Sequence, residues 1–95
     1  REHIGFGGLL MTDDLSMKAL GGSFAEKAAK AQAAGCDMLL HCNGKLEEMR
    51  EVATAALPLK GRASVRAKAA LKAQKKPQKF DKVAALKDWE SLQSL

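Results

Sequence analysis

The 95-residue chain has no tyrosine, and its aromatic residues amount to only 4% of the sequence. Alanine supplies much of the 46% hydrophobic content. Because alanine buries little apolar area, the hydrophobic core that this chain can build is thin. The two cysteines, Cys36 and Cys42, are too few for a disulfide scaffold, and their spacing matches no zinc-binding pattern. We therefore expect two buried free thiols, as in a reducing cytoplasm, and no metal.

Long apolar runs are also absent. No stretch approaches the roughly 20 apolar residues that a membrane span requires, so we expect no membrane partner. The first apolar stretch, Ile4 to Met11, is interrupted by three glycines and lacks a preceding basic segment, which argues against a secretory leader. These features predict a soluble protein, and we expect it to be cytoplasmic.

Positive charge is concentrated towards the C-terminus of the chain, whose net charge is +5. One short stretch contains a single acid, Asp81, among these basic residues: Lys60, Arg62, Arg66, Lys68, Lys72, Lys75, Lys76, Lys79 and Lys82. The simplest interpretation is the solvated face of a helix. The alternative is a non-catalytic basic helical module that binds anionic polymers such as nucleic acid. That alternative would be stronger with interleaved aromatic residues, and the stretch offers only Phe80.

Two short apolar segments, residues 8–12 and 37–42, have the character of strands, and the second alternates little, as expected for a strand buried on both faces. Between them, Ser23 and Glu26 fit a capping box that begins a helix, and Gly35 supplies a left-handed stop. Strand, helix and strand at this spacing predict a parallel βαβ unit. Two parallel strands cannot cover their own edges and faces, so we expect further strands upstream of the chain.

Three more helices are predicted after the second strand. The first begins near Leu46, and the second runs from Lys60 to Lys76 and is stopped by Pro77. Asp81 can cap the last helix. Its apolar stripe of Val83, Leu86 and Trp89 is expected to dock on the rest of the protein.

Asp13 follows the first predicted strand, where parallel α/β proteins place active-site groups. A carboxylate there could act as a nucleophile or a base. Alternatively, Asp13 or Asp14 caps a short helical turn over residues 15–20. His41 and Cys42 are neighbours on a strand and point to opposite faces, so they cannot grip one metal ion together. His3 is expected on the surface.

Two motifs carry a resemblance to a known family. Residues 5–17, GFGGLLMTDDLSM, resemble the active-site signature of glycoside hydrolase family 3, in the form found in its bacterial β-N-acetylhexosaminidases. The resemblance continues through residues 33–43, AAGCDMLLHCN. It implies an α/β fold, the C-terminal portion of a (β/α)8 TIM-type barrel with the last two strands, their helices and C-terminal helices. Residues 1–60 would form the last two βα units, and residues 61–95 a basic helical extension.

The resemblance also implies a function. Asp13 matches the family's catalytic nucleophile, and Asp14 is then a loop neighbour. The expected reaction is retaining hydrolysis of terminal β-linked N-acetylglucosamine from muropeptides of cell-wall recycling, through a glycosyl-aspartate and without a cofactor. The substrate would be an N-acetylglucosamine-containing sugar, and no nucleic-acid partner is expected.

The chain also departs from the family. The family's general acid/base, a His assisted by an Asp, and its sugar-binding groups lie upstream in a part of the barrel that these residues do not match, and neither His3 nor His41 stands in such a motif. We therefore expect this chain to need the missing N-terminal portion as a partner and to be inactive alone. A truncated or split gene product with no activity of its own remains a third hypothesis.

Overall fold

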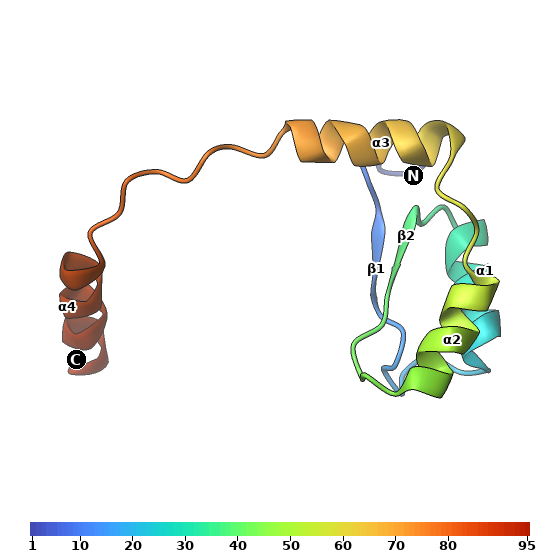
Figure 1. The fold of residues 1–95 in the computed structure, drawn as a ribbon, viewed down its shortest axis with the longest axis horizontal. Coiled ribbons are helices and arrows are strands. Elements are labelled where there is room, and N and C mark those ends of the chain that lie inside the picture. The colour runs from blue at the N-terminus through green and yellow to red at the C-terminus, as the bar shows by residue number, and fades with distance from the viewer.

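The computed structural model describes residues 1–95, which form two strands and four helices (Figure 1). The elements in chain order are β1 (Met11–Asp14), α1 (Phe24–Ala33), β2 (Met38–Leu40), α2 (Leu46–Ala55), α3 (Gly61–Lys72) and α4 (Lys82–Gln93). The strands β1 and β2 are parallel neighbours, as the βαβ prediction required. None of the helices is long and apolar enough to cross a lipid bilayer.

The helix α1 begins and ends where the sequence predicted. The Ser23 side chain accepts a hydrogen bond from the Glu26 amide at 3.2 Å, which satisfies one of the free amides of the first turn. Gly35 ends the helix with φ of 105°, a conformation that glycine adopts without steric cost. The helix therefore takes its bounds from local sequence signals.

The small core lies between β2 and the two helices α1 and α2, which pack against each other (Figure 1). Three residues of the chain are buried, namely Leu15, Ala28 and Val52. Partly buried side chains, including Phe24 and Leu39, pack around them. With so few buried residues, this core supplies little hydrophobic stabilisation.

The expectation that the chain is the C-terminal portion of a (β/α)8 barrel is wrong. The structure is a small α/β unit with one two-stranded parallel sheet and four helices. A barrel requires a sheet that closes on itself, whereas β1 and β2 each have one neighbour and are only 4 and 3 residues long. The exposed side chains of Met11 and Met38 show that the sheet face away from the helices is open.

The C-terminal helix α4 stands apart from this unit (Figure 1). Residues 74–81 have no regular structure, and the radius of gyration is 18.5 Å, against about 12 Å for a compact chain of this length. Asp81 caps α4 as predicted, accepting from the amides of Val83 and Ala84 at 3.0 and 3.1 Å. The predicted docking of its stripe is absent here, since Leu86 and Trp89 are 56% and 58% exposed.

Candidate active site

The strand β1 contains an extra residue near its end. Met11 pairs with Met38 and Asp14 pairs with Leu40, so three steps along β1 match two steps along β2. This is a β-bulge, a feature that re-aims side chains and is frequent next to active sites. The Leu40 amide donates a hydrogen bond to Oγ1 of the Thr12 side chain at 2.8 Å. Beside Asp13, the Thr12 side chain therefore replaces a backbone carbonyl as the acceptor of this hydrogen bond between the two strands.

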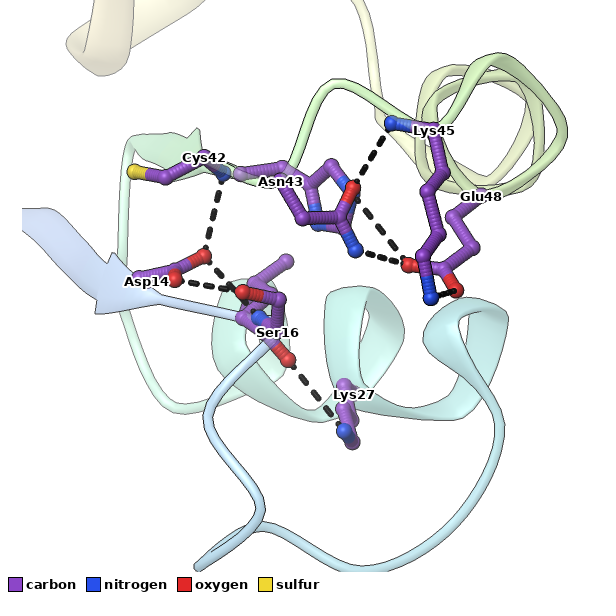
Figure 2. A network of polar contacts seen from close by, with 9 residues as sticks. Asp14, Ser16, Lys27, Cys42, Asn43, Lys45 and Glu48 are labelled. Atoms are coloured by element: carbon purple, nitrogen blue, oxygen red, sulfur yellow. Dashed lines mark hydrogen bonds and ion pairs between the residues drawn. The ribbon is translucent and has the colours of Figure 1, made fainter.

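The carboxylate of Asp14 joins the ends of the two strands (Figure 2). Its Oδ1 accepts from the Ser16 amide at 3.0 Å and from the Cys42 amide at 3.1 Å, and its Oδ2 accepts from the Ser16 hydroxyl at 2.5 Å. The hydrogen bonds from Ser16 are the main cause that holds the pKa of Asp14 below its usual value. Asp14 is thus the residue that caps the turn after β1.

Asp13 takes no part in that cap. It is exposed, and its Oδ1 accepts a hydrogen bond from the amide of Asp14 at 2.8 Å. It borders an open groove of about 610 Å³ that extends over the turn and along α1. Lys27 and Lys30 also line this groove, and Lys27 Nζ donates to the Leu15 carbonyl at 3.2 Å. Asp14 lines the same groove, but its carboxylate accepts three hydrogen bonds, whereas that of Asp13 accepts one.

The loop after β2 is fixed by its own side chains (Figure 2). Asn43 Oδ1 lies 2.7 Å from His41 Nε2 and accepts from the Lys45 amide at 3.0 Å, while the Asn43 Nδ2 donates to Glu48. The His41 side chain is 7% exposed and packs edge-on against the Phe24 ring, with the ring centres 5.1 Å apart. His41 is therefore a loop residue whose side chain is shielded from solvent, whereas His3 is exposed as predicted.

Both cysteines are free thiols, but the expectation that they are buried is wrong, since Cys36 is half-buried and Cys42 is exposed. Partial desolvation of the thiol is the main cause that raises the pKa of Cys42, followed by the charge of Asp14, a hydrogen bond to Asp14 and the charge of Asp13. Cys42 is thus kept in its neutral form, which makes it a poor nucleophile. No three His, Cys, Asp or Glu side chains come together in a way that could hold a metal ion.

A cluster that sequence reasoning missed lies at the opposite end of β2. The Asp37 side chain, 5% exposed, contacts Arg1 at 2.5 Å and Arg66 at 2.9 Å and accepts from the Leu10 amide at 3.0 Å. Burial opposes ionisation of Asp37, but the Leu10 amide and the two guanidinium groups outweigh it and lower the pKa. The available signal was the position of an aspartate at the start of a strand that the sequence predicted to be buried, where a charge requires partners.

The basic stretch lies mostly in solvent. Arg66 pairs with Asp37, and the other eight residues of the stretch are exposed. They lie at the N-cap of α3, on α3, on residues 74–81 or at the first position of α4. This agrees with the interpretation as a solvated face. The arrangement offers no aromatic platform for nucleic-acid bases, since Phe80 lies outside the helices.

The fold is that of an α/β protein in which two carboxylates, those of Asp13 and Asp14, lie at the end of β1. Parallel sheets bind ligands at the carboxyl ends of their strands. The family model described as "Glycosyl hydrolase family 3 N terminal domain" matches residues 1–75. The chain belongs to glycosyl hydrolase family 3, which confirms the resemblance seen in the two motifs. The matched region is the family's N-terminal domain and not the C-terminal part of a barrel, a second finding against that expectation.

Curated relatives match a shorter stretch. A protein named beta-hexosaminidase from Actinobacillus pleuropneumoniae serotype 5b is 49% identical over 45 residues, which is 45% of this chain and 13% of the relative. Proteins of the same name from Photobacterium profundum and Tolumonas auensis are 45% and 47% identical over 47 residues, which is 47% of this chain and 14% of each relative. The matches thus span about one seventh of the relatives' length or less. No solved structure gives a significant match.

Proposed function

We propose that this chain supplies the nucleophile of a retaining β-N-acetylhexosaminidase, and that the nucleophile is Asp13. The observation that carries the proposal is the contrast between two adjacent carboxylates in a chain of this family. Both carboxylates border the groove of about 610 Å³. That of Asp14 accepts hydrogen bonds from the Ser16 amide and hydroxyl and from the Cys42 amide, whereas Asp13 is exposed and accepts one, from the Asp14 amide. The names of the curated relatives support the choice of a hexosaminide as substrate.

The chemistry follows the two-step retaining scheme. An Asp13 oxygen attacks the anomeric carbon of a terminal β-linked N-acetylglucosamine, and the bond from that carbon to the leaving oxygen breaks as the leaving group takes up a proton. Water then attacks the same carbon and releases the sugar and the Asp13 carboxylate. Retention follows because the two displacements each invert the configuration.

The proton donor lies outside these residues. His41 is buried against Phe24 and engaged with Asn43, and His3 is exposed in the N-terminal segment, so neither faces the groove beside Asp13. We infer that further polypeptide of the family supplies the acid and the sugar-binding groups. Muropeptide-derived sugars as substrates and the cytoplasm as the location belong to this same proposal.

The test is covalent trapping in a chimera. The chimera is the Actinobacillus pleuropneumoniae protein named beta-hexosaminidase in which this whole chain replaces the 45-residue stretch that it matches. Treatment with a fluorinated aryl N-acetylglucosaminide and peptide mass mapping should find the sugar on Asp13. Asp13→Ala should lose more than about 10³-fold in turnover, because the covalent route is closed. A label on Asp14, or an Asp13→Ala chimera with full activity, would overturn the assignment.

A further inference from the structure

The β-bulge leaves Asp13 between two side-chain anchors. On one side, Thr12 Oγ1 accepts the hydrogen bond of the Leu40 amide at 2.8 Å. On the other, Asp14 Oδ1 accepts that of the Cys42 amide at 3.1 Å. Leu40 and Cys42 lie two positions apart on the chain segment beside β1. In a regular parallel ladder the amides of such alternate residues donate to backbone carbonyls of the neighbouring strand. Here they donate to side chains instead.

Without these two bonds, the end of β1 would be poorly fixed. A bulge interrupts the ladder and leaves the extra residue unpaired. Past the bulge, the backbone bond from the Leu15 amide to the Leu40 carbonyl, at 2.9 Å, is the next link between the two segments. The orientation of the residue between Thr12 and Asp14 therefore depends on the side chains of its two neighbours.

We propose that Thr12 and Asp14 are positioning residues that hold Asp13 in its attacking orientation across the bulge. The inference rests on the proposed function of Asp13. Neither residue touches the reacting carbon in this scheme. Each acts by binding one amide of the neighbouring segment, and Asp14 adds the two bonds from Ser16 that fix the turn beyond it.

The chain offers a conservative variant for each anchor. Thr12→Val keeps the shape but removes the acceptor for the Leu40 amide, whereas Thr12→Ser keeps the acceptor. Asp14→Ala removes the acceptor for the Cys42 amide, whereas Asp14→Asn keeps an oxygen for the amides and can donate its own NH₂ to the Ser16 hydroxyl. A positioning role needs the acceptor and not the charge.

In the chimera, Thr12→Val and Asp14→Ala should each lower kcat by about 10- to 100-fold, because a displacement near 1 Å can cost about 10²-fold. KM should change less than about threefold, and the rate of covalent labelling by the fluorinated glycoside should fall in parallel. Thr12→Ser and Asp14→Asn should stay within about fivefold of the parent. Matched controls are Thr54→Val and Asp88→Ala, which lie on α2 and α4 away from the strands, and they should leave kcat unchanged.

Rates are taken per active site titrated with the fluorinated glycoside, so that loss of folded protein is not counted as loss of turnover. If Asp14→Asn is as slow as Asp14→Ala, the charge of Asp14 matters and the positioning role is refuted for that residue. Should Asp14→Ala fail to fold, the Thr12→Val and Thr12→Ser pair still decides the question. If Thr12→Val and Asp14→Ala leave kcat unchanged while Asp13→Ala abolishes it, this inference is refuted and the proposed function stands. If Asp13→Ala keeps full activity, the proposed function itself is refuted.

Discussion

Removing the Asp37 carboxylate should destabilise the protein by about 2–3 kcal/mol. Loss of one partner from a fully buried ion pair costs about 3–5 kcal/mol, because the remaining charge stays buried without compensation. Here the side chains of Arg1 and Arg66 are 17% and 21% exposed, so water can solvate them in part and the cost is lower. The Leu10 amide also loses its acceptor, at about 1 kcal/mol.

The assay is thermal unfolding of the chimera at pH 7. At roughly 2 °C per kcal/mol for a large domain, Asp37→Ala should lower Tm by about 4–6 °C. Asp88→Ala is the matched control, since Asp88 is an exposed aspartate whose carboxylate makes no hydrogen bond or ion pair. It should shift Tm by less than about 1 °C.

The pH dependence follows from the lowered pKa of Asp37. A carboxyl whose folded pKa lies below the unfolded value contributes stability that is present above the unfolded pKa, near 3.8, and that is lost as the pH falls through the folded pKa. The Tm difference between the parent and Asp37→Ala should therefore be the same at pH 7 and pH 5 and shrink only below about pH 4. A difference that disappears by pH 6, or an Asp37→Ala shift no larger than that of Asp88→Ala, would refute the reasoning.

The remaining predictions concern the chain alone and Cys42. Purified residues 1–95 should not hydrolyse aryl N-acetylglucosaminides, because general acid assistance contributes about 10²–10⁴-fold, and robust turnover would contradict the need for further polypeptide. The same chain should melt broadly, since three residues are buried, and a sharp melt in a demonstrated monomer would contradict this. Iodoacetamide at pH 7 should alkylate Cys42 faster in Asp14→Asn than in the parent, because one cause of the raised thiol pKa is removed; equal rates would exclude that influence.

The parts of the fold that the sequence predicted are those set by neighbouring residues. Ser23 and Asp81 cap α1 and α4 through amides two or three positions along the chain. The end of α3 was predicted less well, at Lys76 instead of Lys72. Lys76, which directly precedes Pro77, is disfavoured in helical conformation, and no packing holds a further turn.

The features that sequence reasoning missed all join distant residues. The Asp37 cluster brings together Arg1 and Arg66, which lie 36 and 29 positions from Asp37. The bulge in β1 depends on the register between two strands, and a single strand carries no signal for it. The hypothesis that Asp13 is the nucleophile stays a prediction, and it rests on local sequence alone, namely the position near the end of β1 and the family motif.

The separation of α4 has a consequence for protein engineering. Residues 74–81 connect α4 to the rest of the chain without regular structure, so changes in the helix and changes at the strand ends share no contacts. Substitutions that share no partners usually add independently in free energy. The face with Val83, Leu86 and Trp89 can therefore be recoded for solubility, or fused to an affinity tag, without repacking the strand ends that carry Thr12, Asp13 and Asp14.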